Sequence, residues 1–123
     1  MTNAKAPAVA RAHLHSMRQS ERKVRVVLDV IRGKPVDEAF RILSFTRRAA
    51  AETILKLLRS AVANASQKGT ADAGTLYVSG AWADGGTFFK KMEAKAMLRH
   101  GIMKTRTCHV TLELNERPVK GGK

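Results

Sequence analysis

The sequence predicts one α+β domain, in which three amphipathic helices lie between an N-terminal strand and further strands near the C-terminus. Two observations predict it. Apolar residues recur at helical spacing through the first half, whereas segments at both ends alternate apolar and polar residues as strands do. The length of 123 residues fits one modest core, and neither a repeat nor a linker divides the chain. We therefore expect residues 1–123 to form a single domain.

Positive charge is the strongest functional signal in the composition. The chain has 23 Lys and Arg residues against 10 Asp and Glu, a formal net charge of +13. The excess is concentrated in residues 1–35, with eight basic and two acidic side chains, and in residues 87–109, with six and one. Self-repulsion of this size destabilises a folded domain unless an anionic partner compensates it. We therefore expect these two regions to bind nucleic acid, with an affinity that falls as salt rises.

Residues 9–17 have the alternation of a strand. Small or apolar side chains alternate there with basic and imidazole side chains, which are Arg11, His13 and His15. A period of two predicts a strand with one buried face and one basic face. A mobile basic arm is the alternative that the residues leave open.

The first helix is expected to begin at Ser20, whose hydroxyl suits an N-terminal cap, while Glu21 favours the positive end of the helix dipole. Gly33 suits the C-terminal cap, and Pro35 prevents the helix from continuing. Its apolar stripe has helical spacing and consists of Val24, Val27, Leu28 and Ile31.

Two further helices are predicted next. A short one covers residues 36–43, with Asp37 and Glu38 at its start, and a longer one covers about residues 47–66, with Thr46 as its cap. The buried face of the short helix is expected to consist of Val36, Ala39, Phe40 and Leu43. The stripe of the longer helix is expected to consist of Ala51, Ile54, Leu55, Leu58, Ala61, Val62 and Ala65.

Two strand patterns occupy the C-terminal part, after a polar loop at residues 67–74. Residues 75–83 are expected to form a strand with Leu76, Val78 and Trp82 in phase, and Asp84-Gly85-Gly86 to break or bulge it. Residues 110–114 alternate Val and Leu with Thr and Glu, which predicts another strand. Residues 119–123 are expected to form a frayed basic tail.

The segment between these strands, residues 88–99, gives conflicting signals. It consists largely of good helix formers, but its position between two strands favours a long basic hairpin, and the residues alone leave the choice open. Phe88 and Phe89 suit stacking on unpaired RNA bases, although packing in the core is slightly favoured for both.

The side chains with catalytic or metal-binding chemistry do not form a recognisable site. Cys108 is the single cysteine, which excludes an intrachain disulfide, and we expect it to be a buried small hydrophobe. His13 and His15, together with Cys108-His109, give too few ligands for a metal. Asp37-Glu38 is explained by its place at a helix start, and Gly85-Gly86 lacks the spacing of a phosphate loop. We expect no enzyme activity, no cofactor and no metal, and the chain has no apolar run long enough to span a membrane.

Six segments of the chain resemble, in the same order, the bacterial large-subunit ribosomal protein L-twenty-two family. The resemblance covers roughly residues 10–115. The segments are residues 20–25 (SERKVR), 29–34 (DVIRGK), 39–46 (AFRILSFT), 48–50 (RAA), 60–65 (SAVANA) and 105–112 (TRTCHVTL).

This resemblance implies three helices packed on a small antiparallel sheet, with a long extended basic β-hairpin at about residues 86–108. It also implies a body near the nascent-chain exit and a hairpin tip that lines the exit tunnel. The family's tip usually reads Pro-Arg-Ala-Lys-Gly-Arg, whereas here Met97 replaces a basic residue and Leu98 a turn glycine. The tip candidates are Ala94, Lys95, Ala96, Met97, Leu98, Arg99 and His100.

We therefore expect a structural constituent of the large ribosomal subunit that binds ribosomal RNA, aids assembly and contributes a hairpin toward the exit tunnel. A free-standing RNA-binding or RNA-chaperone module is the alternative. The expected partners are large-subunit RNA and other large-subunit proteins in a cytoplasmic ribosome, with an organellar ribosome less favoured; no membrane or small-molecule substrate is expected. The residues expected to bind RNA are Arg11, His13, His15, Arg18, Arg22, Lys23, Arg25, Arg32, Lys34, Lys90, Lys91, Lys95, Arg99, Lys104 and Arg106.

Overall fold

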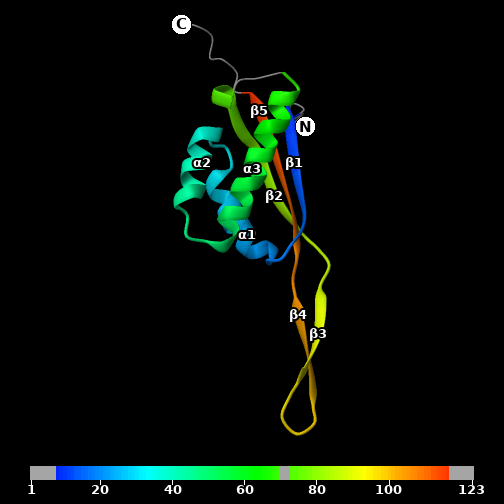
Figure 1. Cartoon of the computed structure of the whole chain (residues 1–123). Coiled ribbons are helices and arrows are strands. Elements are labelled where there is room, and N and C mark those ends of the chain that lie inside the picture. Colours follow the sequence, from blue (N-terminus) through cyan, green and yellow to red (C-terminus); the bar gives the residue numbers. More distant parts are fainter. Residues whose placement is uncertain (1–7, 70–72, 117–123) are drawn as a thin grey trace, which may run out of the picture.

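The main sheet joins three strands that lie far apart in the sequence. Strands β1 (Ala10–Met17), β5 (Cys108–Glu116) and β2 (Leu76–Gly85) are antiparallel and lie in the order β1-β5-β2 (Figure 1). The last strand is therefore central, and Leu112 and Leu114 on it are fully buried. The strand predicted over residues 9–17 is confirmed, as is the predicted strand at the C-terminal end.

The structure, a computed structural model, describes residues 8–69 and 73–116. The basic tail expected at residues 119–123 lies outside these ranges, as does part of the polar loop expected at residues 67–74. A short 3-10 helix, Ala73–Thr75, leads into β2.

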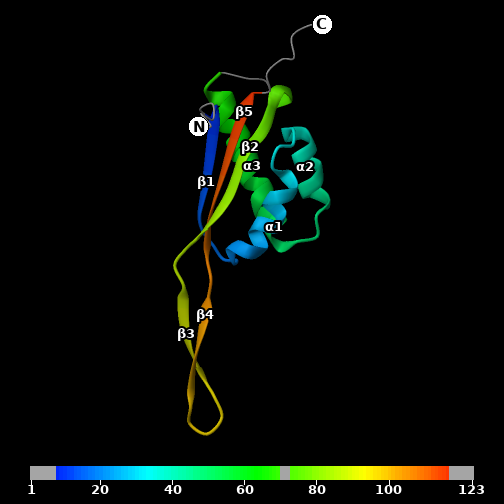
Figure 2. The same ribbon diagram turned by 180° about the vertical axis from the view of Figure 1, so that it is seen from behind.

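Three helices cover one face of the main sheet and leave the other face open. They are α1 (Glu21–Ile31), α2 (Val36–Phe45) and α3 (Ala49–Gln67), and the view from behind shows the strands in front of α3 (Figure 2). The three predicted helices, packed on a small antiparallel sheet, are confirmed. Each large aliphatic side chain buried between these layers stabilises the fold by roughly 1.5–3 kcal/mol before the entropy cost. The largest fully buried side chains include Leu28, Ile31, Ile54, Leu58, Leu76, Leu112 and Leu114.

Two predicted helix caps are wrong in detail. Ser20 occupies the N-cap position of α1, but among the described residues its side chain makes no capping hydrogen bond. The Thr46 hydroxyl donates to the Ile42 carbonyl, so Thr46 ends α2 instead of starting α3, which begins two residues later than expected with Arg48 at its N-cap. Gly33 does follow α1 with a positive φ of 82°, and its N–H donates to the Val78 carbonyl on β2.

A bulge in β2 shifts the alternation of buried and exposed residues by one, so residues after the bulge face the opposite side of the sheet from the one predicted. The pairing with β5 shifts between Val78 and Gly80, so Ser79 is an extra residue. Leu76 and Val78 are buried as predicted, but Trp82 is 38% exposed on the open face, because the extra residue puts Ala81 and Ala83 on the buried side instead. The break expected at residues 84–86 is confirmed, since Asp84 and Gly85 still pair with β5 but β2 ends at Gly85.

Side chains from two helices cover both edges of the main sheet. The guanidinium groups of Arg25 and Arg32 on α1 donate to the carbonyls of Ala83 and Ala81 on β2, at distances down to 2.8 and 2.6 Å. On the opposite edge, Asn64 and Lys68 of α3 donate to the carbonyls of Arg11 and Val9. Unpaired strand edges invite pairing with other chains, so these polar side chains close the sheet as well as hold the helices.

The undecided segment, residues 88–99, forms a strand and a turn instead of a helix. Strand β3 (Phe89–Ala94) pairs with β4 (His100–Thr105) in a separate antiparallel sheet, which extends away from the helices (Figure 1). All residues of both strands are exposed except the partly buried Gly101. Pairing between strands therefore overrides the helix propensity of this segment. We call residues 89–105 the β3–β4 hairpin.

Gly86 and Thr107 join the hairpin to the main sheet. The Gly86 N–H donates to the Thr107 carbonyl at 2.8 Å, and the buried Thr107 hydroxyl donates to the Thr87 carbonyl at 2.6 Å. A Cβ atom on residue 86 would lie 2.6 Å from the Thr107 hydroxyl. The close approach of the segments that contain Gly86 and Thr107 therefore requires glycine at residue 86.

Candidate nucleic-acid interface

A cavity of about 480 Å³ lies where the β3–β4 hairpin meets the start of α1. Four of its lining side chains are cationic, and the rest are polar. The loop before α1 and its first turn supply one wall, and the end of β4 and the following residue supply the other. We call this hollow the junction cavity, and it is lined by Arg18, Gln19, Ser20, Lys23, Lys104, Thr105 and Arg106.

A second hollow of about 310 Å³ shares Gln19 and Lys23 with the junction cavity and adds Arg48. Ser20 and Arg48 are the N-cap residues of α1 and α3, so two helix N-termini open here. Among the described residues, neither N-cap side chain makes a capping hydrogen bond. Free amides at a helix N-terminus and its positive dipole favour an anion such as phosphate. The two hollows therefore offer cationic side chains and backbone donors to the same ligand.

Phe88 and Phe89 lie beside the junction cavity and not in the core. Their exposed fractions are 49% and 50%, which corrects the expectation of core packing. The Arg106 guanidinium lies 5.7 Å from the centre of the Phe88 ring, and that of Arg18 lies 5.7 Å from the Phe89 ring. Such contacts orient the guanidinium groups while leaving them exposed. The Arg106 guanidinium also lies 3.9 Å from the Glu21 carboxylate.

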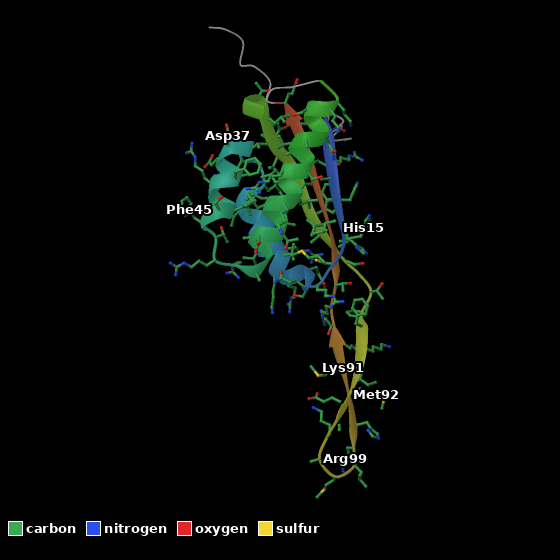
Figure 3. The ribbon with its side chains drawn as sticks, in the orientation of Figure 1. His15, Asp37, Phe45, Lys91, Met92 and Arg99 are labelled. Carbon is green, nitrogen blue, oxygen red and sulfur yellow. The ribbon has the colours of Figure 1, made fainter. Side chains whose placement is uncertain are left out.

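The hairpin carries cations that repel one another. Lys90 and Lys104 are directly opposed across β3 and β4, and both are exposed. Like charges in this position destabilise an antiparallel pair. Lys91 and Arg99 are also exposed, with Lys91 labelled on the strand and Arg99 at the tip (Figure 3). Lys95 differs, since its ammonium lies 3.4 Å from the Glu93 carboxylate.

Several other residues expected to bind RNA have partners within the protein. Arg11 forms an ion pair with Glu113 at 2.9 Å, and Lys34 lies 3.9 Å from Glu38. Arg25 and Arg32 bind the edge of β2, as described above. Arg22 is exposed on the first turn of α1.

Three of the four histidines, His13, His15 and His109, lie on the open face of the main sheet, and His100 begins β4 in the hairpin. His13 and His15 are exposed, with ring centres 6.3 Å apart, and the rings of His15 and His109 lie 5.3 Å apart. Within the described residues there is no group of three or more His, Cys, Asp or Glu side chains that could hold a metal ion. Cys108 is fully buried, as expected, and burial raises the pKa of its thiol, with a further rise from Glu21 and an opposing effect from Arg25.

The turn at the hairpin tip has an unusual backbone. Met97 and Leu98 both have a φ of 61°, although neither is glycine, and they are 90% and 96% exposed. The Lys95 N–H donates to the Arg99 carbonyl at 2.7 Å and closes the turn. Side chains of this type rarely adopt a positive φ. The tip therefore keeps a tight turn at the position where glycine would be expected, and it presents two apolar side chains.

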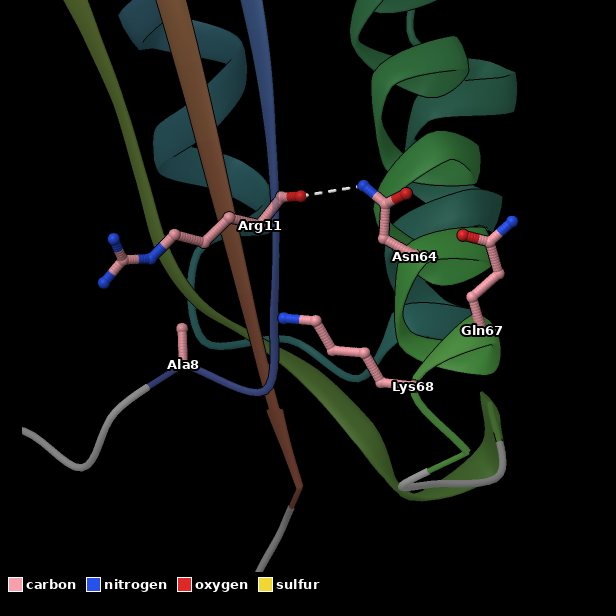
Figure 4. A pocket seen from close by; sticks show the side chains of 5 residues that line it. All are labelled: Ala8, Arg11, Asn64, Gln67 and Lys68. Carbon is pink, nitrogen blue, oxygen red and sulfur yellow. Dashed lines mark hydrogen bonds between the residues drawn. The ribbon is translucent and has the colours of Figure 1, made fainter.

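A further hollow of about 610 Å³ lies between β1 and the end of α3 (Figure 4). Three of its four polar lining residues, Arg11, Asn64 and Lys68, already interact within the protein. The Asn64 amide donates to the Arg11 carbonyl at 2.9 Å, and the Lys68 ammonium donates to the Val9 carbonyl at 3.2 Å. This hollow is therefore a contact between helix and sheet edge rather than a second anion site.

Sequence reasoning missed three residues near these surfaces. Arg48 was not among the expected RNA-binding residues, because Thr46 was expected to be the cap and Arg48 fell inside the predicted helix. Gln19 lines both basic hollows and has a buried side-chain oxygen without a partner in the described part of the chain. His109 joins His15 only because β1 and β5 pair, and periodicity carries no information about that pairing.

Within residues 8–69 and 73–116, no helix combines the length and hydrophobicity that crossing a bilayer requires. A family model described as ribosomal protein L22p/L17e matches residues 12–115. The large ribosomal subunit protein uL22 of Clostridium novyi (strain NT) is 50% identical over 109 residues, which cover 88% of this chain and 97% of that protein. Proteins of the same name from Geobacter sulfurreducens and Myxococcus xanthus are 44% and 46% identical, covering 88% and 85% of this chain and 97% and 94% of those proteins.

Proposed function

Because the chain belongs to the family of ribosomal proteins L22p/L17e, we propose that it is a structural constituent of the large ribosomal subunit that holds ribosomal RNA between its hairpin and its helices. The junction cavity is the observation that carries this proposal, since four cations and a helix N-terminus converge there. The chemistry is binding alone, and no catalytic step is involved.

The phosphate backbone is the proposed ligand of the junction cavity and of the hairpin. Arg18, Lys23, Lys104 and Arg106 line the cavity, and Lys90 and Lys91 continue the positive charge along β3. A net charge of +13 and the directly opposed Lys90 and Lys104 both cost stability in the free protein. Phosphates would remove both costs and release their own counterions.

We propose that the hairpin tip does not contact phosphate. Met97 and Leu98 are apolar and almost fully exposed, so they are poor ligands for phosphate. Their exposure supports the role implied by the resemblance, in which residues 94–100 point toward the nascent-peptide exit tunnel. The cations of β3 and β4 would then anchor the hairpin along the RNA on the way to that tip.

The double variant Lys90→Gln, Lys104→Gln tests the phosphate contacts. We expect the salt dependence of binding to a large-subunit RNA transcript, plotted as log affinity against log salt, to lose about 1.5–2 units of slope, because two phosphate contacts disappear. The affinity at about 0.1 M salt should fall about tenfold or more. Filter binding over a salt series measures both quantities.

The matched control is Lys56→Gln, Lys68→Gln, which removes the same charge from α3. Lys56 lies 3.9 Å from Glu52, and Lys68 binds the Val9 carbonyl, so neither is needed at the proposed interface. We expect a clearly smaller change of slope in the control. Equal slopes for the two double variants would mean that binding follows total charge alone, and the proposed interface would be wrong.

A further inference from the structure

The open face of the main sheet carries a group of aromatic and imidazole rings next to the hairpin. His15 lies between two other rings, 6.3 Å from the centre of His13 and 5.3 Å from that of His109. Trp82 lies in the same cross-strand row as His13, because both pair with Thr111 on β5. Within residues 8–69 and 73–116, no helix covers this side of the sheet, as the view from behind shows (Figure 2). We call these four residues the ring platform.

Hydrogen bonds orient two of the four rings, those of His13 and His109, before any ligand arrives. The His109 ring accepts, at Nδ1, a hydrogen bond from the Ser16 N–H at 3.0 Å. The His13 ring lies with Nδ1 3.1 Å from the Thr111 hydroxyl. Ser16 has a positive φ of 58° and lies in the bulge of β1, so the backbone there is bent toward His109. Rings that are already oriented lose little conformational entropy when they bind a flat partner.

The charges on this face do not suit phosphate. Asp84 is exposed and pairs with His109 across the strands, and the one guanidinium in the neighbouring row, Arg11, is neutralised by Glu113 at 2.9 Å. Flat rings instead match the faces of nucleic-acid bases, which stack on aromatic and imidazole side chains when they are unpaired.

We propose that the ring platform binds unpaired bases of the RNA whose phosphates the junction cavity holds. The two surfaces both adjoin the base of the hairpin, because His15 and Arg18 belong to one short segment and the His109 ring lies beside Gly86. This inference rests on the proposed function, and it adds a second mode of contact that does not depend on charge. A base-paired helix would hide the faces that the platform needs, so the partner is a single-stranded loop, bulge or junction.

His15→Ala in the full-length chain tests the platform, with a short single-stranded oligoadenylate carrying one 2-aminopurine as the probe. We expect the affinity to fall about fivefold or more, the smaller end of what one lost stack costs. The quenching of 2-aminopurine fluorescence should weaken with it. The slope of affinity against salt should not change, because stacking releases no counterions. His15→Phe, which keeps a ring, should restore both affinity and quenching.

Two controls separate the platform from general effects. Phe45→Ala removes an 84% exposed ring on the helical side of the molecule, away from His15 (Figure 3), and should leave the affinity unchanged. A duplex RNA should bind wild type and His15→Ala equally. An unchanged affinity of His15→Ala for the single strand, or an equal loss on the duplex, would overturn the inference. Either result would leave the phosphate contacts standing, since Lys90→Gln, Lys104→Gln tests those through the salt slope.

Discussion

The two sheets of this protein use positive charge in opposite ways. At the β2 edge of the main sheet, Arg25 of α1 and Arg32 just after it bind strand carbonyls, and Arg11 of β1 binds a carboxylate. In the β3–β4 hairpin, Lys90 and Lys104 face each other, and both remain exposed. The cations of the first sheet are therefore balanced within the protein, whereas Lys90 and Lys104 repel each other in the free protein, and an anionic partner would relieve that repulsion.

This difference shows that a count of cations does not locate a binding surface. Arg25 and Arg32 lie in one of the two strongly basic regions of the sequence, residues 1–35, but their guanidinium groups bind a strand edge. The length of the arginine side chain and its fork of donors suit this role as well as they suit phosphate. What distinguishes the two uses is the partner that the fold provides.

The largest expected difference between the two sheets is in stability. Leu112→Ala removes a fully buried side chain from the central strand and should lower the free energy of unfolding by about 2–5 kcal/mol. Ile102→Ala on β4 removes a side chain that is 65% exposed and should change it by less than about 0.5 kcal/mol. Urea denaturation of both variants measures the difference. Similar losses would mean that the hairpin contributes to the core.

Arg32→Met should have an intermediate effect. It keeps the length of the side chain but removes donors to the Ala81 carbonyl, and we expect a loss of about 1–2 kcal/mol in the free energy of unfolding. The salt slope of RNA binding should stay close to that of wild type, in contrast to the hairpin lysines. A normal stability together with a reduced slope would place Arg32 on the RNA instead.

The smallest effect is expected at Cys108. Because burial raises the pKa of its thiol, the unfolded thiol ionises at lower pH than the folded one. The neutral Cys108 thiol therefore makes its full contribution to the free energy of unfolding below the pKa of the unfolded thiol. That contribution is lost as the pH rises through this value toward the pKa of the folded thiol. Denaturation between about pH 7 and 10 should show a slightly steeper loss in wild type than in Cys108→Ala. Identical pH profiles would contradict the raised pKa.

The same burial makes a kinetic prediction. Cys108 is fully buried, and labelling requires both access and ionisation, so a disulfide reagent should label it about a hundredfold or more slowly than it labels the unfolded chain. Fast labelling of the folded protein would mean that β5 opens next to the hairpin.

The helices and the strands of the main sheet were predictable because their side chains repeat with a clear period. The stripe of α1 and the alternation of β1 both follow from burial of one face, which places apolar residues at regular intervals in the sequence. The bulge at Ser79 has no such periodic signal, because it depends on pairing with β5, which comes some thirty residues later in the sequence. For this reason Trp82 was assigned to the wrong face. The hairpin was left open for a similar reason: local propensity and long-range pairing disagree there.

The candidate interface was predictable in part. Arg18, Lys23, Lys104 and Arg106 were expected to bind RNA, but nothing in the sequence shows that they line one cavity. Core packing was slightly favoured for Phe88 and Phe89, but both are about half exposed. The spacing of aromatic residues does not reveal that this segment leaves the body of the protein.

Lysine acetylation tests the central claim most directly. Purified large subunits and the free protein would be treated with the same reagent, and the modification of each lysine would be compared by mass spectrometry. Four lysines should react readily in the free protein: Lys23, Lys90, Lys91 and Lys104. In the subunit, contacts with RNA phosphates should protect them strongly. Equal reactivity of these four lysines in both samples would contradict the claim that the junction and the hairpin hold the RNA.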